Sequence, residues 1–534
     1  MKKKINSRKI FSKSVWGLSA VFFGILTVIF SVAYAVTPQS SNFINEYLGI
    51  DPYERIDTGE EKPFDVYKSD YMNADGTYNH SAMRKNSEKI ALQVAQEGSV
   101  LLWNNDNALP LAKDSKVSFL GISSNAYLYS AAGSGHLGVS PSSTLEQACK
   151  DNGLIINQSL MNAYKFLSGT YGNYLGSAGS TLGGASIGDK CYVEYGINEA
   201  PFEKLNTTQA GNVTNTIPDY GDAAVLIISR NDGEDGDTNY NTKECLGNNY
   251  LDLAHEEVKI LNELKTLKDE GKVKKIVLVI NAAQPMQMKN IKTFDIDACL
   301  WAGVGGNVSN QQIASILSGN ANPSGRTIDT YTFDNYSNPS TVNMGDFEWS
   351  TKTGLPATAD YSHNDKYLTY AESIYVGYRY FETRYEDSVL NSGNAKSSKG
   401  ALMADTWDYT KEVAFPFGYG NSYTTFSHDG FNVKEELDKY IVSVTVTNTG
   451  SVSGKDVVQI YLQKPYTEYD IANVIEKSAV ELVGFEKTNE LKPGQKETVE
   501  VKVNKSDFKS YDAYNKGTYI LEKGDSPRGE GRVN

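Results

Sequence analysis

Short runs of almost continuous apolar residues recur through the middle of this chain of 534 residues. Such runs lack the alternation of a strand with one wet face, and they are typical of strands buried on both faces of a parallel sheet. Four of them are "VSFLGI" (117–122), "AAVLIIS" (223–229), "KIVLVIN" (275–281) and "ACLWAG" (298–303). Residues 253–271 and 308–319 instead carry apolar residues at helical spacing and end in glycine. This alternation predicts an α/β sandwich domain over residues 97–425, with a largely parallel sheet and helices on both faces.

A further helix is predicted ahead of this domain, within residues 80–102. Its apolar residues recur at helical spacing and fall on one face, as in an amphipathic helix. These residues are Met83, Ile90, Ala91 and Val94. The chain before this helix is polar and rich in Asp and Asn, so we assign residues 37–96 to a stalk and a leading helix.

The pattern changes to strict alternation after Phe426. In "YIVSVTVTNTG" (440–450) and "ETVEVKVN" (497–504), every second residue is valine and the residues between are mostly polar. Period two with intervening turns predicts a β-sandwich of immunoglobulin type over residues 426–534. The alternating strand that ought to complete it is absent after Asp525, so we expect this domain to be truncated.

The first 36 residues carry a targeting signal. Residues 1–14 are basic and should stay in the cytoplasm, whereas residues 15–36 contain no charge and are long enough to cross a bilayer. We expect a transmembrane signal-anchor, which would make this a single-pass protein of the cell membrane with an extracellular body. The alternative is a cleaved secretory signal, because Ala33-Tyr34-Ala35 resembles a cleavage site.

Net charge and cysteine content limit the classes of partner and cofactor that this protein could bind. The formal net charge is −14, and because six of the 51 basic residues precede residue 15, the rest of the chain is more acidic still. Such a surface repels phosphate backbones, which argues against nucleic acid as a partner. Four cysteines are too few for a disulfide scaffold, although one bridge between Cys191 and Cys245 remains open, and no C-x-x-C spacing indicates zinc. No metal or cofactor is therefore predicted.

An acidic segment directly follows one of the predicted strands. In "SRNDGEDGDTNY" (229–240), four carboxylates fall within six positions: Asp232, Glu234, Asp235 and Asp237. In an open α/β sheet, ligands bind in loops beyond the carboxyl ends of the strands, and the glycines of this segment let the backbone approach a ligand. The segment is therefore a candidate site.

This acidic segment has three possible interpretations. A calcium loop of EF-hand type fails, because its spacing would place Gly233 and Thr242 at ligand positions that need carboxylates. A solvated acidic loop is the second alternative. The third is a general acid for glycoside hydrolysis, because crowded carboxylates disfavour the ionisation of Glu234 and so raise its pKa.

Six longer segments occur in the order of a known family. They are "EGSVLLWNNDNALPL" (97–111), "YSAAGSGHLGVSPSSTLEQA" (129–148), "LVINAAQPMQM" (278–288), "LWAGVGGNVSNQQIASILSGNANPSGRTIDTY" (300–331), "YAESIYVGYRYFET" (370–383) and "FPFGYGNSYTTF" (415–426). With them, the chain from about residue 85 to 522 resembles glycoside hydrolase family 3, the β-glucosidase group. The resemblance implies its α/β-sandwich and fibronectin-III-like domains, in members with permuted domain order. It also implies retaining, exo-acting hydrolysis of β-linked glucosides or xylosides.

The resemblance extends to individual site residues. "SRNDGEDGD" (229–237) is similar to the family motif that contains the acid/base glutamate, and it aligns Glu234 with that residue. It implies that Arg230, Gly233 and Asp237 support this residue or belong to the substrate loop. Asp235 stands where the family usually has glycine.

The nucleophilic Asp of the family belongs to a separate (β/α)₈ barrel, which this sequence does not contain. Residues 37–96 are far too few for a domain that typically takes about 250 residues. We therefore expect a truncated product or one half of a split enzyme, nearly inactive alone, whose partners are a β-linked oligosaccharide and a separate barrel. The alternative is a non-catalytic surface module that binds carbohydrate or protein through aromatic loops containing Tyr375, Tyr378, Tyr380 and Phe417.

Overall fold

The structure is a computed structural model of the chain. It describes residues 15–30, 69–73, 76–130, 141–175, 195–207, 211–231, 242–343, 347–348, 366–367, 370–388 and 407–521. The chain divides into two compact units, Met1–His80 and Ser81–Asn534. The second unit contains the layered domain, the β-sandwich and the candidate site.

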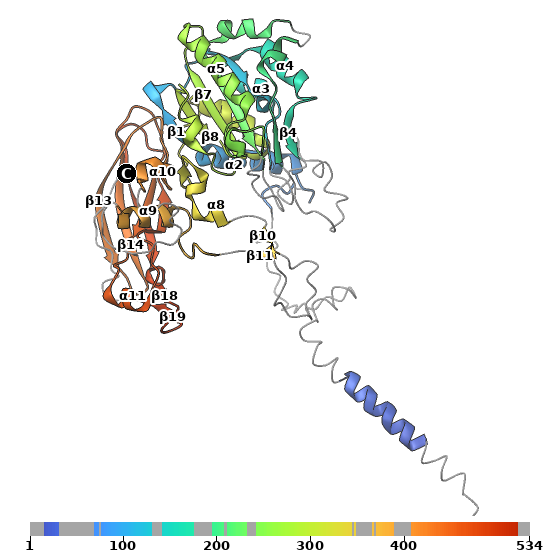
Figure 1. Ribbon diagram of the computed structural model, residues 1–534, viewed down its shortest axis with the longest axis vertical. Coiled ribbons are helices and arrows are strands. Elements are labelled where there is room, and N and C mark those ends of the chain that lie inside the picture. Colours follow the sequence, from blue (N-terminus) through green and yellow to red (C-terminus); the bar gives the residue numbers. More distant parts are fainter. Residues whose placement is uncertain are drawn as a thin grey trace, which may run out of the picture. The chain divides into compact units, whose positions relative to one another are not determined.

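A six-stranded sheet forms the centre of the α/β domain (Figure 1). Its order is β1-β8-β7-β6-β2-β3, in which β1 is antiparallel to β8 and all other neighbours are parallel. The strands are β1 (Val100–Asn104), β2 (Lys116–Leu120), β3 (Ile155–Ile156), β6 (Ala223–Arg230), β7 (Ile276–Ala282) and β8 (Ala298–Trp301). The four apolar runs form β2, β6, β7 and β8, which confirms the predicted, largely parallel sheet.

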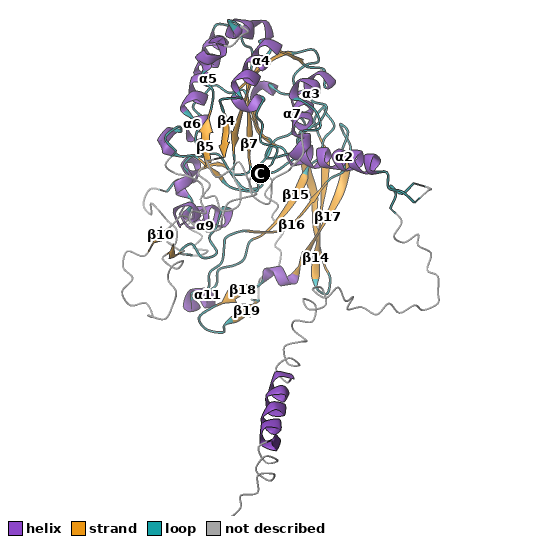
Figure 2. Cartoon of the chain, turned by 90° about the vertical axis from the view of Figure 1, so that its right-hand side faces the viewer, coloured by secondary structure: helices purple, strands orange, loops and turns teal. Residues whose placement is uncertain are grey.

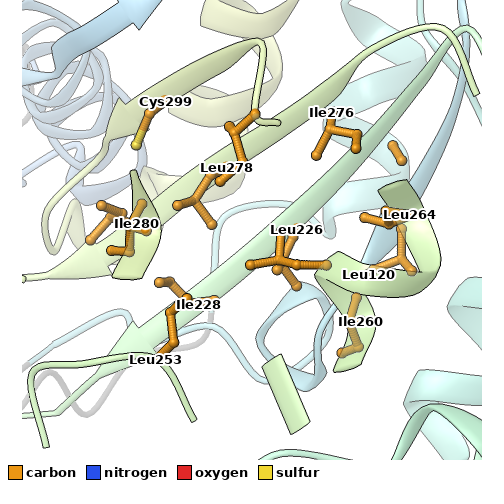
Figure 3. Close-up of a cluster of buried hydrophobic side chains, with 14 of the residues drawn as sticks. Leu120, Leu226, Ile228, Leu253, Ile260, Leu264, Ile276, Leu278, Ile280 and Cys299 are labelled. Carbon is orange, nitrogen blue, oxygen red and sulfur yellow. The ribbon is translucent and has the colours of Figure 1, made fainter. Parts of the chain in front are cut away.

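Helices cover both faces of this sheet (Figure 2). They are α3 (Leu145–Asp151), α4 (Gln158–Leu167), α5 (His255–Asp269), α6 (Met288–Ile291) and α7 (Ser309–Leu317). Successive side chains of β6 enter opposite cores. Leu226 and Ile228 belong to the same buried cluster as Ile260 of α5 (Figure 3), whereas Val225 lies in the cluster that contains residues of α3 and α7. Because successive residues of a strand point to opposite faces, burial of both faces explains why the run is apolar throughout.

The predicted leading helix is α2 (His80–Gly98), but its apolar face does not point into the protein. Met83, Ile90 and Val94 are all exposed, and no residue of α2 is buried. An amphipathic helix on a protein surface normally turns its apolar face to the core. Contacts of α2 with the α/β domain come from the opposite face, on which Ala95 and Gln96 lie.

The alternating segment after Phe426 forms paired antiparallel strands, as predicted. The strands are β13 (Phe426–Glu435), β14 (Lys439–Asn448), β15 (Val457–Leu462), β16 (Glu481–Lys487), β17 (Lys496–Asn504), β18 (Ser510–Asp512) and β19 (Thr518–Ile520). In β14, Val442, Val444 and Val446 are buried against residues of β17. The predicted truncation after Asp525 falls outside the described residues.

The remaining elements are short. They are β4 (Gly172–Leu175), β5 (Tyr195–Asn198), β9 (Tyr331–Thr332), β10 (Phe347–Glu348), β11 (Lys366–Tyr367), β12 (Val413–Phe415), α8 (Pro339–Asn343), α9 (Tyr378–Ser388), α10 (Tyr409–Glu412) and α11 (Glu468–Asn473). The aromatic residues that the alternative hypothesis assigns to a binding surface are largely internal. Tyr375 and Tyr380 are 2% and 3% exposed and pack with Phe381, while Tyr378 and Phe417 stack on each other with ring centroids 4.4 Å apart. The hypothesis of an aromatic binding surface is wrong for Tyr375 and Tyr380, because both rings fill a core.

Near the start of the chain, residues 15–30 form a helix. A membrane span needs about 20 apolar residues. Within the part of the chain that the structure describes, no helix has the length and hydropathy to cross a bilayer. The membrane-spanning helix predicted over residues 15–36 is thus not supported, and residues 1–14 and 31–36 lie outside the described ranges.

Candidate active site

The carboxyl ends of the parallel strands carry buried polar side chains. β6 ends in Ser229 and Arg230, and β7 places Asn281 beside them in register with Ser229. All three side chains are almost completely buried. In open α/β sheets this edge is where ligands bind.

Asn281 joins three segments at this edge. Its side-chain oxygen accepts hydrogen bonds from the Ser229 hydroxyl at 2.7 Å and the Leu128 amide at 2.8 Å. Its side-chain nitrogen donates to the carbonyl oxygens of Leu128, at 3.1 Å, and of Gly303, at 2.7 Å. The loops that follow β2 and β8 are therefore tied to β6 and β7 by one fully satisfied amide.

Arg230 uses all five of its N–H donors within the protein. Nε donates to the Tyr250 carbonyl at 2.7 Å, and the two terminal nitrogens donate to both oxygens of Glu257, at 2.8 Å each. The last two N–H groups bond the carbonyls of Ser229 and Asp252. A guanidinium has five donors, so none remains for a substrate. Arg230 therefore joins the end of β6 to α5 and to residues 250–252.

Tyr250 holds Asn231, the residue that directly follows β6. Its hydroxyl accepts from the Asn231 amide at 2.7 Å and donates to the Asn231 carbonyl at 3.0 Å. Both peptide groups of Asn231 are thus held by one buried side chain. The segment that begins at residue 232 starts from a rigid point on the carboxyl edge of the sheet.

Asp252 organises the segment that leads into α5. It is buried and accepts hydrogen bonds from the Leu253 amide and from the side chains of Gln287 and Asn290. Burial raises the pKa of Asp252, and these three hydrogen bonds act in the opposite direction. The segment preceding α5 is therefore anchored independently of Arg230.

A second buried carboxyl group, Glu199, lies at the end of β2. It follows β5 and accepts hydrogen bonds from the amides of Ile122, at 2.8 and 3.0 Å, and Ala200, at 2.9 Å. Burial raises the pKa of Glu199 to about 8, and the negative charge of Glu257 adds to this effect. Glu199 is therefore mostly protonated at neutral pH.

Only one of the predicted site residues is among the residues that the structure describes. Arg230 is described, and its contacts are those of an anchor rather than of a substrate ligand. Gly233, Glu234 and Asp237 lie outside the described residues, within 232–241. Both flanks are held, since Asn231 bonds Tyr250, and Thr242 donates its amide to the Asn248 carbonyl at 2.8 Å.

Sequence reasoning missed most of the polar network at this edge. Glu257 and Tyr250 carry no local motif, and Glu257 lies 27 positions after its partner Arg230. One signal was available, because a carboxylate in the first turn of a predicted helix can accept from a backbone amide at the helix start. Glu257 accepts in this way from the Ala254 amide at 2.7 Å.

The described residues contain no metal site or reactive thiol. No group of three or more His, Cys, Asp or Glu side chains among them could hold a metal ion. Cys149, Cys245 and Cys299 are buried and free, and burial raises the pKa of each thiol. A buried thiol with a raised pKa is a poor nucleophile.

Two family models match the chain. The model of the Glycosyl hydrolase family 3 C-terminal domain matches residues 99–378, and that of the Fibronectin type III-like domain matches residues 456–526. The first match contains the six-stranded sheet and the polar network at its carboxyl edge. The second contains β15 to β19.

Curated relatives are β-glucosidases. The chain is 29% identical to "Beta-glucosidase" of Ruminococcus albus over 79% of its own length and 36% of that protein. It is 28% identical to "Beta-glucosidase A" of Butyrivibrio fibrisolvens over 83% of its own length and 49% of that protein. The chain thus spans about a third to a half of the length of these relatives.

Solved structures give the same picture. A β-glucosidase from Paenibacillus barengoltzii superposes with a TM-score of 0.61 at 26% identity, over 82% of this chain and 40% of that one. β-Glucosidase 3B from Thermotoga neapolitana, solved in complex with α-D-glucose, superposes with a TM-score of 0.59 at 24% identity, over 82% and 51%. The second likeness is one of fold. In the described parts of the chain, the sheets have six, three or two strands, and none is an eight-stranded barrel.

Proposed function

Because the chain belongs to glycoside hydrolase family 3, we propose that it supplies the acid/base half of a retaining, exo-acting β-glycosidase. The proposed substrates are β-linked glucosides, xylosides or short oligosaccharides. Support comes from the β-glucosidase relatives and from a carboxyl edge built of buried polar side chains. We also infer that the body acts outside the cytoplasm, because residues 1–36 pair a basic end with an uncharged segment.

Glu234 is the proposed acid/base residue. The main support for this role is the well-held end of β6. There, all five N–H groups of Arg230 bond to other protein groups, and the Tyr250 hydroxyl bonds to Asn231. Glu234 follows that point by three residues. Arg230 is then a positioning residue, and we propose that Gly233 and Asp237 belong to the substrate loop.

The proposed reaction needs two carboxyl groups about 5 Å apart. Glu234 donates a proton to the glycosidic oxygen while the bond to the sugar breaks and a nucleophilic carboxylate bonds to the sugar carbon. Glu234 then removes a proton from the water that hydrolyses this glycosyl ester. The nucleophile is proposed to belong to a (β/α)₈ barrel supplied by other polypeptide, so the chain alone should be nearly inactive.

The first prediction tests this role. With an added family 3 barrel, the intact chain should hydrolyse an alkyl β-glucoside, and Glu234→Gln should slow this at least about 100-fold, because the amide cannot donate the proton. The loss should be smaller for an aryl β-glucoside with an acidic phenol, since that leaving group needs less protonation. Steady-state kinetics on both substrates measure the difference.

Glu244→Gln is the matched control, because Glu244 is an exposed carboxylate near the same segment. It should retain the rate of the unmodified chain. Rapid hydrolysis by the chain alone that Glu234→Gln leaves unchanged would disprove the proposed role. An equal loss with both leaving groups would also exclude proton donation by Glu234.

A further inference from the structure

The outer face of α2 carries a line of exposed apolar side chains. Met83 is 42%, Ile90 is 55% and Val94 is 67% exposed. At 100° per residue, these positions and Ser87 lie within roughly 60° of the helix circumference. We call Met83, Ser87, Ile90 and Val94 the α2 stripe.

The opposite face of α2 is already bound to the α/β domain. Gln96 donates to the Ser315 hydroxyl of α7 at 2.8 Å. Gln312 of α7 donates to the Ala95 carbonyl at 3.0 Å and to the Ser99 hydroxyl at 2.9 Å. Figure 2 likewise shows α2 beside α7. The stripe is therefore not the face that attaches α2 to its own domain.

Nothing local explains the apolar residues of the stripe. A helix with one face on protein and the other in water normally carries polar residues on its outer face. Isoleucine and valine also favour the helix less than Leu, Lys or Glu, so they do not strengthen α2. An apolar stripe opposite a docked face indicates a second contact surface.

The helix that carries the stripe lies at the same edge of the sheet as the candidate active site. Asn307, which follows the carboxyl end of β8, donates to Glu88 of α2 at 3.4 Å. In the sheet, β8 is separated from β6 by β7 alone, which is roughly 10 Å at about 4.8 Å per strand. α2 therefore lies at the edge of the sheet at which β6 ends.

We propose that the α2 stripe is the docking surface for the (β/α)₈ barrel that supplies the nucleophile, an inference that rests on the proposed function. The chain spans 36% and 49% of the two curated relatives, so each of these proteins contains enough further polypeptide for a barrel of about 250 residues. The outer layer of such a barrel is a ring of helices. An apolar helical stripe packs in the groove between two helices.

The test measures binding of the intact chain to a separately expressed barrel region of Butyrivibrio fibrisolvens β-glucosidase A. The variant carries Met83→Gln, Ile90→Gln and Val94→Gln together. We expect its Kd for the barrel to rise at least about tenfold, because buried apolar anchors dominate such interfaces. Its thermal unfolding should stay unchanged, since all three side chains are exposed.

Leu437→Gln is the control, because Leu437 is 96% exposed in the turn between β13 and β14. It should leave barrel binding unchanged. The proposal is overturned if the triple variant binds as well as the unmodified chain, if Leu437→Gln weakens binding equally, or if the unmodified chain does not bind. It is also overturned if the chain alone forms a dimer that the triple variant disperses, since a second copy would then occupy the stripe.

An assay of β-glucoside hydrolysis by the complex distinguishes a failure of the docking proposal from a failure of the proposed function. If the barrel restores hydrolysis equally to the unmodified chain and to the triple variant, the docking surface is wrong and the function stands. If binding depends on the stripe but the complex hydrolyses no β-glucoside, the docking surface stands and the function is wrong.

Discussion

Replacing Arg230 by methionine should lower the free energy of unfolding of the α/β domain by about 3–5 kcal/mol. The side chains of Arg230 and Glu257 are 0% and 2% exposed, and their ion pair is 2.8 Å long. Without the guanidinium, Glu257 remains as a buried carboxylate that keeps one described donor, the Ala254 amide. Three carbonyl oxygens also lose the hydrogen bond that Arg230 donates to each. Urea unfolding followed by circular dichroism should show a lower midpoint and an unchanged slope.

Two variants provide the comparison. Lys265→Met breaks an ion pair on the exposed face of α5, where Lys265 and Asp269 are 49% and 60% exposed, and it should cost less than about 1 kcal/mol. Combining Arg230→Met with Glu257→Met removes both buried charges, and it should recover most of the lost stability. If Arg230→Met costs no more than Lys265→Met, the ion pair does not anchor the end of β6.

The second large effect concerns pH. The folded-state pKa of Glu199 is raised to about 8 from an ordinary value of 4.5, so the folded state holds a proton that the unfolded state releases between these values. Its contribution to stability is complete below about pH 4.5 and is lost as the pH rises to about 8. The loss is roughly 1.4 kcal/mol per pH unit, of the order of 5 kcal/mol in total. Urea midpoints measured between pH 5 and 8 should fall accordingly.

Glu199→Gln should flatten this decline, because an amide keeps the shape and can still accept from the Ile122 amide without titrating. The variant should therefore match the unmodified chain near pH 5 and exceed it near pH 8. Part of the slope should remain, since burial raises the pKa of Asp252 as well. Glu263→Gln, on the exposed side of α5, is the control and should keep the full decline. If Glu199→Gln shows the same decline as Glu263→Gln, Glu199 does not stay protonated in the folded protein.

Much of the fold could be predicted because burial leaves a local record. Each residue of β6 is buried on one face or the other, so the strand is apolar along its length. β14 has one buried face, and its valines alternate with polar residues. The antiparallel edge strand β1 could not be told from a helix by its sequence, because "VLLWN" is equally compatible with the end of the preceding helix.

The direction of an apolar face could not be predicted. The spacing of Met83, Ile90 and Val94 identified a helix with an apolar side, which α2 has. Periodicity reports that a face is apolar but does not report what covers it. In α2, hydrogen bonds exchanged with α7 attach the opposite face to the domain, so the apolar residues lie outward.

The sequence by itself determined the class of both domains, the position of β6 and the acidic segment that follows it, because these depend on neighbours along the chain. Only the tertiary structure decided that Arg230 is an anchor, that burial raises the pKa of Glu199 and that α2 presents an apolar stripe. The physical reason is that pairing, desolvation and packing depend on groups brought together from distant parts of the chain. Glu257, 27 residues from Arg230, and the Ile122 amide, 77 residues from Glu199, are such groups.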